Sequence, residues 1–211
     1  VDLNGDGLSD IVGHDNHYNW TAAYSRGYST EQMYNFASPS IPVDQSVVWA
    51  DFDGDGTTDW GWKTSNTQWS VNLSNINRQL VTQITTGHGA TYKFDYAPLT
   101  DKSVYTRADT STYPQADFVG SVYVVKQVST DDGTGQRQKI AYRYYGGTLN
   151  LQGRGYLGFT MGEVFDSSSQ IRTKTFYVRD PRLRGARVKS TERRTFDGRV
   201  LQLAEYDPVF V

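Results

Sequence analysis

The sequence predicts an all-β protein in two parts, in which repeated loop-and-strand units come first and long antiparallel strands follow. Two observations lead to this prediction. Aromatic residues make up 14% of the chain, with 15 tyrosines, and there are 20 glycines, which is typical of strands joined by tight turns. A nine-residue acidic pattern occurs twice, and long runs of alternating polar and apolar residues follow it. We expect no long helix, and at most a helical turn at residues 30–36.

The composition narrows the class of protein. The chain has 211 residues, of which 37% are hydrophobic, and this is enough to bury a core in one large or two small domains. It contains no cysteine, which excludes disulfide bonds, thiolate chemistry and cysteine-based zinc sites. No apolar run approaches the roughly 18 residues that a membrane-spanning helix needs, so we predict no membrane span.

Charge is distributed unevenly along a chain whose formal net charge is only −2. Residues 1–59 carry ten acidic side chains and one basic side chain, whereas residues 172–199 carry ten basic and three acidic ones. The basic residues are spaced along strands without an aromatic stacking platform, so we predict no nucleic-acid partner. We expect a solvated or assembly-lining face there. One hypothesis is that this face contacts acidic surfaces in an assembly, which salt would weaken.

The acidic pattern is D-x-[DN]-x-D-G-x-x-D, and its two copies lie 49 residues apart. Alternating oxygen-bearing side chains around a tight turn suit Ca²⁺, which takes six to eight oxygen ligands, and the glycine at the sixth position permits the sharp turn. We predict two structural calcium sites. The predicted ligands are Asp2, Asn4, Asp6, Asp10 and the Leu8 carbonyl in loop one (residues 2–10), and Asp51, Asp53, Asp55, Asp59 and the Thr57 carbonyl in loop two (residues 51–59).

Two features separate these loops from other acidic turns. An EF-hand has a glutamate at position twelve, where this chain has Gly13 and Trp62, and strand-like residues follow each loop. The alternative is a pair of Asx turns, in which Asp and Asn cap their own backbone. The repetition of the whole pattern favours calcium, in a structural role, because a fully coordinated ion leaves no position for a substrate.

The repeat extends beyond the loops, since Trp20 aligns with Trp69 and Ser25 with Ser74. A period of about 40–50 residues is typical of propeller blades or another repeat array. We predict that Trp20 and Trp69 lie in the cores of their units. Trp62 has no aromatic equivalent, so we expect it to be the better candidate for a surface contact.

The second part of the chain predicts strands at 91–96, 121–130, 138–145, 172–178, 186–196 and 200–206, with a hairpin signal in DDGTGQR at 131–137. The run YRYYGGTLNLQGRGYLGF (142–159) places several glycines around Arg154. It matches neither the phosphate loop nor the dinucleotide pattern, so we interpret it as a tight crossing between strands where only glycine fits.

The loops and their period resemble the FG-GAP (VCBS) repeats of β-propellers. This resemblance implies four-stranded blades with a calcium loop between the first strands, so that residues 1–85 would hold parts of two or three blades. A propeller needs typically four to eight blades. We therefore expect this chain to be a piece of a longer polypeptide.

A second resemblance covers most of the remaining chain. ITTGHGATYKFDYAPLTD (84–101), PQADFVGSVYVVKQVSTDDGTG (114–135) and the glycine-rich run are similar to the region that joins propeller repeats to the Rhs-type shell in toxin-complex B components and Salmonella virulence plasmid B-type proteins. FDGRVLQLAEYD (196–207) looks like an Rhs or YD repeat. The resemblance implies that residues 86–211 begin an Rhs-type β-shell.

The function implied by the resemblance is structural. We expect a non-enzymatic segment of a secreted or cell-surface bacterial toxin that docks to a translocation component and helps to enclose a toxic cargo, together with other parts of the same large polypeptide. The alternative is a calcium-dependent adhesion or glycan-binding propeller module. We predict no catalytic residue: no serine lies in a nucleophile elbow, and residues 14–17 (HDNH) are interpreted as a surface turn.

Overall fold

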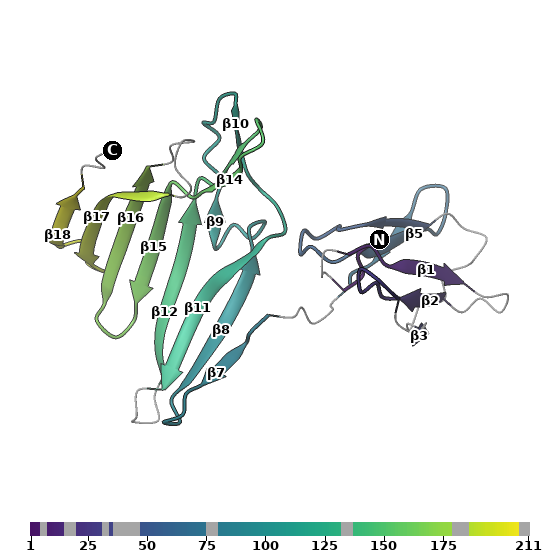
Figure 1. The fold of residues 1–211 in the computed structure, drawn as a ribbon, viewed down its shortest axis with the longest axis horizontal. Helices are drawn as coiled ribbons and strands as arrows, with labels where there is room; N and C mark the ends of the chain where they lie inside the picture. The colour runs from purple at the N-terminus through teal and green to yellow at the C-terminus, as the bar shows by residue number, and fades with distance from the viewer. Residues whose placement is uncertain are drawn as a thin grey trace. The chain divides into compact units, whose positions relative to one another are not determined.

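The computed structural model describes residues 1–4, 8–14, 20–30, 34–35, 47–74, 80–131, 137–178 and 186–206. The chain divides into two compact units, Val1–Leu80 and Val81–Val211, and each is described by itself. The described residues form strands and turns with no helix (Figure 1), which confirms the all-β prediction. The helical turn expected at 30–36 is wrong where it is described, because Tyr34 and Asn35 pair with a neighbouring strand.

The described part of the first unit holds two antiparallel three-stranded sheets. Sheet one has the order β1 (Ile11–His14), β2 (Trp20–Ala23), β3 (Tyr34–Asn35), and sheet two the order β4 (Val47–Ala50), β5 (Asp59–Lys63), β6 (Trp69–Asn72). Each acidic loop leads into the first or second strand of its own sheet. Loop one precedes β1, and loop two connects β4 to β5.

The two sheets pack through tryptophans. Trp20 of sheet one lies 5.7 Å from Trp49 of sheet two, and Trp49 lies 5.8 Å from Trp60, measured between ring centroids. Val12 and Trp62 pack against the same cluster. Register places Trp60 opposite Trp49 on sheet two, so one face of sheet two, its inner face, covers the Trp20 face of sheet one.

The second unit is built on one large sheet. In the described residues its strands have the order β18-β17-β16-β15-β12-β11-β8-β7, all antiparallel, with β9 (Tyr105–Thr106) added in parallel beside β12 (Figure 1). The bounds are β7 Gln83–Thr85, β8 Thr91–Pro98, β11 Tyr123–Asp131, β12 Arg137–Tyr145, β15 Met161–Asp166, β16 Ile171–Val178, β17 Arg187–Thr195 and β18 Val200–Glu205. The predicted strands of this half are thus present, within a few residues of their expected ends.

A small antiparallel sheet of β10 (Gln115–Asp117), β13 (Thr148–Asn150) and β14 (Gly155–Gly158) lies in the same unit. Phe159, just after β14, joins it to the large sheet, because the Phe159 ring packs 4.8 Å from Tyr144 of β12 and 6.0 Å from Tyr105 of β9. Tyr105 is buried, as are the nearby Val104 and Leu99. Together with Ala97, these are the buried apolar residues among the described residues of the second unit.

The glycine-rich run passes through this junction. Gly146 has φ +60°, and a Cβ there would lie 2.2 Å from the Thr160 hydroxyl. A Cβ at Gly147 would lie 3.1 Å from the Tyr105 hydroxyl, which accepts a hydrogen bond from the Gly147 amide at 2.9 Å. The interpretation as a tight crossing is therefore confirmed at Gly146, and Gly147 is closely approached by two tyrosine side chains.

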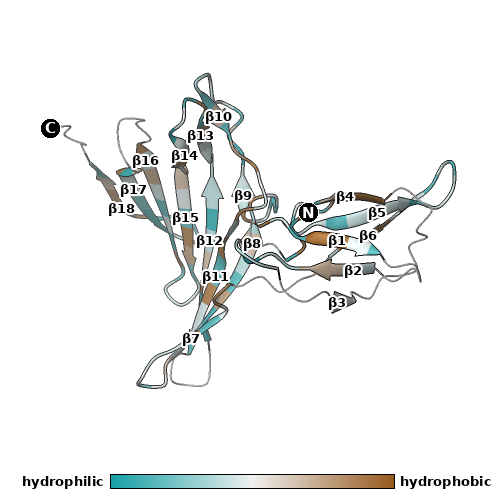
Figure 2. Cartoon of the chain, turned by 45° about the vertical axis from the view of Figure 1, so that its right-hand side comes forward, coloured by the Kyte–Doolittle hydropathy of each residue, from teal (hydrophilic) through white to brown (hydrophobic). Residues whose placement is uncertain are grey.

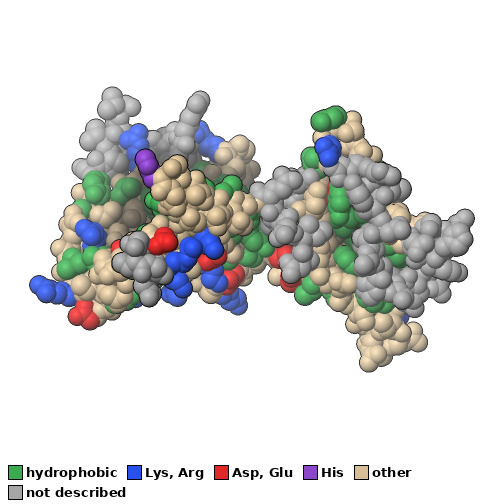
Figure 3. Space-filling model, turned by 90° about the horizontal axis from the view of Figure 1, so that it is seen from below, with side chains coloured by type: hydrophobic (Ala, Val, Ile, Leu, Met, Phe, Trp, Pro, Cys, Tyr) green, Lys and Arg blue, Asp and Glu red, His purple; other side chains and the backbone are tan. Residues whose placement is uncertain are grey.

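The large sheet has two chemically different faces, because side chains alternate along each strand. Figure 2 shows hydrophilic and hydrophobic residues along the strands of this sheet. One face, here called the tyrosine face, carries mainly aromatic and aliphatic side chains. Its members include Tyr92, Phe94, Tyr96, Val128, Ile140, Tyr142, Tyr144 and Val164, as the strand register shows. The other face is charged and is described below. Figure 3, which views the molecule from below, shows hydrophobic side chains exposed among polar ones.

The boundary between the units lies between Leu80 and Val81, a few residues before the 85/86 boundary that we expected. The reason is β7, which pairs with β8 in the register Ile84 with Tyr92. The hairpin turn of residues 86–90 that looked like a boundary therefore belongs inside the large sheet.

Candidate functional site

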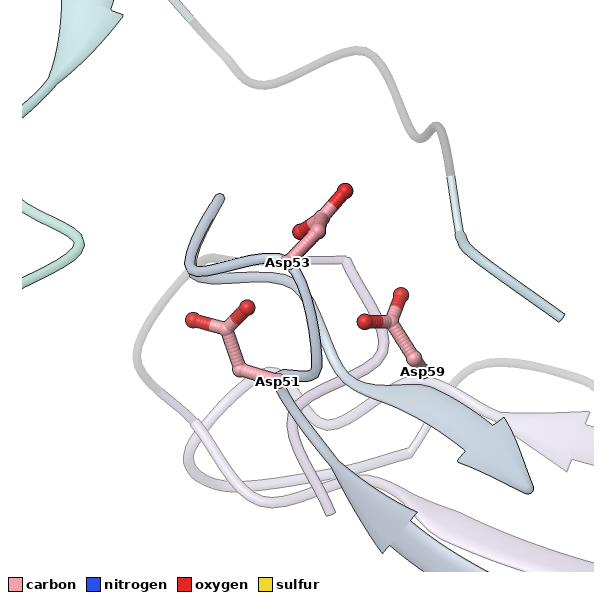
Figure 4. A group of neighbouring side chains, drawn as sticks. All are labelled: Asp51, Asp53 and Asp59. Carbon is pink, nitrogen blue, oxygen red and sulfur yellow. The ribbon is translucent and has the colours of Figure 1, made fainter. Parts of the chain in front are cut away.

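Loop two gathers three carboxylates. One oxygen each from Asp51, Asp53 and Asp59 lies within 4.8 Å of the other two, on the loop between β4 and β5 (Figure 4). Ligands on opposite sides of a calcium ion lie about 4.6–5.2 Å apart, given Ca–O distances of roughly 2.3–2.6 Å. These three of the predicted ligands can therefore share one ion.

Asp59 is the fixed point of loop two. It is fully buried, and its two oxygens accept hydrogen bonds from the Phe52 amide at 2.8 Å and from the Ser74 amide at 2.7 Å. The carboxylate thus joins the start of the loop to the chain just after β6. Each oxygen keeps a second lone pair, so these bonds orient Asp59 without preventing it from binding a cation.

The other predicted ligands of loop two bind the loop's own backbone. Asp51 accepts from the Gly56 amide at 2.7 Å, Asp53 from the Asp55 amide at 3.0 Å, and Asp55 from the Thr57 amide at 2.7 Å. These are the Asx-type bonds of the alternative interpretation. The loop therefore combines an Asx-bonded turn with a carboxylate cluster of the size that a cation needs.

Electrostatics favour a cation in this cluster. The pKa of Asp53 is raised, first by the loss of hydration and also by the negative charges of Asp55, Asp59 and Asp51, while a backbone hydrogen bond from Asp55 opposes the rise. Like charges a few ångströms apart repel. A bound cation would reverse this effect, because opposite charge favours the ionised carboxylate.

In loop one, Asp10 is held in the same way as Asp59 is in loop two. Asp10 is buried, and its oxygens accept from the Leu3 amide at 2.8 Å and the Ser25 amide at 2.8 Å. With the offset of 49 residues, these partners match those of Asp59. Asp2, Asn4 and Leu8 lie around the same turn, and the Asp2 amide donates to the Thr58 hydroxyl of loop two at 3.2 Å. Asp6 lies outside the described residues.

These amide partners are the functional contacts that sequence reasoning missed. The signal was present, since Ser25 and Ser74 align in the repeat and each follows its aspartate by fifteen residues. The bond itself is made by the backbone, so no side-chain pattern reveals it. The ninth position of each loop is therefore a structural clamp as well as a candidate ligand.

The tryptophan predictions hold for one residue and fail for two. Trp20 is 9% exposed, as predicted, but its equivalent Trp69 is 57% exposed. Sheet two covers Trp20, whereas within the described residues of the first unit the matching face of sheet two has no sheet packed on it. Trp62, the expected surface contact, instead packs against the Trp20–Trp60 cluster, because the inner face of sheet two carries it.

Two of the three histidines, His14 and His88, lie among the described residues. The His14 ring packs edge-on against Trp20 at 5.3 Å, and His88 is exposed between β7 and β8. The remainder of the HDNH stretch lies outside the described residues. No described helix has the length and apolarity to cross a membrane.

Two of three comparisons with known proteins found a match. Residues 26–189 match the family model described as the insecticide toxin TcdB middle/N-terminal region. A crystal structure described as TcdB2-TccC3-TEV matches with a TM-score of 0.58 and 18% sequence identity, over 83% of this chain and 9% of that one. At this identity the likeness concerns the fold, and the chain corresponds to less than a tenth of its neighbour's length. No curated protein matches.

Proposed function

Because the chain belongs to the family of the insecticide toxin TcdB middle/N-terminal region, we propose that it is a structural, non-enzymatic segment of a secreted bacterial toxin-complex component. The observation that carries the proposal is the family match, which runs through both units from residue 26 to residue 189. In this proposal the segment helps the larger polypeptide to dock to a translocation component and to enclose a toxic cargo.

We propose that sheets one and two are neighbouring blades of a propeller of the FG-GAP type. Equivalent residues support this: Leu3 is 3% exposed and its counterpart Phe52 is 47% exposed, with the same contrast at Trp20 and Trp69. The Trp20 face of sheet one thus packs on the inner face of sheet two, and the equivalent Trp69 face of sheet two stays exposed. This arrangement is head to tail, because unlike faces of the two repeats meet. Head-to-tail packing builds rings when its rotation closes, which is how blades assemble.

We propose further that the large sheet begins an Rhs-type shell. Its long antiparallel strands and its exposed outer strands support this, since β18 presents Leu201 and Leu203 to solvent and has only β17 as a neighbour among the described strands. Unpaired edges of this kind are normally protected. A following strand of the same polypeptide would pair with β18.

The test of the toxin-component proposal is the mass and composition of the native particle. Intact mass spectrometry of the native polypeptide should give a mass several times the 23.8 kDa of this chain. Cross-linking of the native assembly should then join lysines of this segment to a separate, larger translocation polypeptide. A native mass near 23.8 kDa, or a particle that contains no second polypeptide, would rule the proposal out.

We propose that loop two binds Ca²⁺ in a structural role, through Asp51, Asp53, Asp59 and, after a small rotation of its side chain, Asp55. The ion would neutralise the carboxylate cluster and stiffen the turn between β4 and β5. Loop one would bind a second ion through Asp2, Asn4, Asp6 and Asp10 with the Leu8 carbonyl, as loop two would with the Thr57 carbonyl. Asp55→Ala should blunt the rise in melting temperature that calcium produces. Identical melting of both proteins in calcium and in chelator would remove loop two as a calcium site.

A further inference from the structure

The charged face of the large sheet, here called the arginine face, is defined by one row of residues that face each other across four strands. Arg143 of β12 lies opposite Glu163 of β15, Glu163 opposite Lys174 of β16, and Lys174 opposite Glu192 of β17. Directly opposed residues share a face. Charge therefore alternates along this row.

The next row on the same face is not balanced. Phe165 lies opposite Arg172, and Arg172 lies opposite Arg194. Like charges directly opposite each other on a sheet are destabilising. Two guanidinium groups, those of Arg143 and Arg172, also stack on the Phe165 ring at 5.2 and 5.0 Å from its centroid. Two arginines thus stack on one phenylalanine, and a third, Arg194, lies opposite one of them.

The exposed charge of this face is positive. The Glu163 side chain is only 4% exposed and is held by a hydrogen bond from the Tyr145 hydroxyl at 2.9 Å. The cations stand outside it, with the side chains of Arg172 and Arg194 exposed by 41% and 43%. A partner that approaches this face meets guanidinium groups before it meets carboxylates.

Arg172 forms an ion pair with Glu163, but its buried Nε makes no hydrogen bond to that carboxylate. Its Nε lies 3.6 Å from Glu163 Oε1 and donates no hydrogen bond within the described residues. The Lys174 ammonium stands 3.8 Å from the same oxygen, so two cations share one buried carboxylate. Arg194 pairs with Glu192 on its own strand. One negative charge between Arg172 and Arg194 would remove their repulsion.

We propose that the arginine face is a docking surface for an acidic segment of polypeptide. Its carboxylates would lie between Arg172 and Arg194, where the fork of each guanidinium matches a carboxylate. Two guanidinium groups already stack on Phe165, so a base could stack there only by displacing them. The neighbouring Phe196 ring lies 6.2 Å from Phe165 and is 43% exposed, and a comparison with oligothymidylate therefore tests the preference for peptide. This inference depends on neither the calcium loops nor the toxin-component proposal.

The test uses the whole chain and a fluorescent poly-glutamate peptide, with binding followed by anisotropy. We expect binding at low salt that weakens steeply at roughly 0.3 M NaCl, where the Debye length falls below about 6 Å. Arg172→Gln and, separately, Arg194→Gln should each weaken binding about tenfold or more, the size expected when one hydrogen bond to a charged group is lost.

Arg193→Gln is the matched control. Arg193 neighbours Arg194 on β17 but faces Thr173 on the opposite side of the sheet, and it is exposed, so its loss should leave binding unchanged. Circular dichroism establishes that each variant is folded, and Arg194→Gln suffices if Arg172→Gln fails to fold. Four results would overturn the proposal. The first is that poly-glutamate does not bind, and the second is that Arg193→Gln weakens its binding as much as the other two variants do. The third is that oligothymidylate binds more tightly than the peptide, and the fourth is that copies of the chain associate at low salt and displace the peptide.

Discussion

Single carboxylates at the ninth position of each loop set the conformation of the first unit. Asp10 and Asp59 each accept two backbone amide hydrogen bonds that join segments seven residues before and fifteen residues after them. A buried amide that loses its acceptor costs about 1–3 kcal/mol. The clamp therefore stabilises the repeat whether or not a cation is bound.

Asp59→Ala should lower the free energy of unfolding of the first unit by about 2–5 kcal/mol in both calcium and chelator, because two amides lose their acceptor. All five tryptophans lie before residue 70, so tryptophan fluorescence during urea unfolding reports on this unit alone. Asp53→Ala is the control, and it should lower the free energy of unfolding chiefly in calcium. Equal losses for both variants in chelator would contradict the clamp.

Tyr144 should be among the last tyrosines to ionise. Burial, with a contribution from Tyr142 and Tyr177, raises its pKa to about 12, and its hydroxyl donates to the Val125 carbonyl at 2.9 Å. A phenol whose folded pKa is raised stabilises the fold below its unfolded pKa of about 10, and this contribution is lost as pH rises toward 12. Absorbance titration should show a late tyrosinate step that Tyr144→Phe removes; an unchanged titration would refute the assignment.

At the scale of elements, most strands could be predicted from local pattern. Alternation in TYKFDY (91–96) and in 172–178 located β8 and β16, because the side-chain period of a strand depends on its own residues. Burial could not be predicted in this way. Trp69 and Trp62 were misassigned because exposure depends on which sheet packs on which face, and that is a long-range property.

Part of the candidate site could also be predicted from local sequence. The acidic residues of loop two are contiguous in sequence, so their grouping around Asp51, Asp53 and Asp59 follows from a local turn. The role of Asp59 as a clamp could not be predicted from composition, because its partner beyond β6 is a backbone amide. The opposed pair of Arg172 and Arg194 depends on strand register and is equally invisible in the sequence.

The junction between the small and large sheets gives a prediction at this scale. Gly146→Ala should destabilise the second unit by about 2–4 kcal/mol, because the methyl group meets Thr160 and the backbone has positive φ. Gly153→Ala shares the positive φ but has open space around it, so it should cost about 1 kcal/mol. Near-ultraviolet circular dichroism during unfolding measures both. Similar costs would mean that close approach at Gly146 is unimportant.

At the scale of the whole molecule, equivalent positions of the repeat have opposite surroundings. Trp20→Ala should cost about 3–5 kcal/mol, as expected for a buried tryptophan, whereas Trp69→Ala should change the stability of this chain by less than about 1 kcal/mol. In the longer polypeptide of our proposal, both substitutions should be costly. Fluorescence-monitored unfolding measures the free energy of unfolding of both variants, in this chain and in the longer polypeptide. A small loss for Trp69→Ala in the longer polypeptide would contradict a third unit packed on Trp69.

The two faces of the large sheet differ in chemistry. Tyrosines and aliphatic side chains line one face, and guanidinium groups around a buried glutamate line the other. Such a sheet presents a different set of side chains on each side. A molecule on one side would contact mainly aromatic and aliphatic side chains, and a molecule on the other side would contact mainly charged ones. A change of ionic strength would therefore alter adhesion to the arginine face more than adhesion to the tyrosine face.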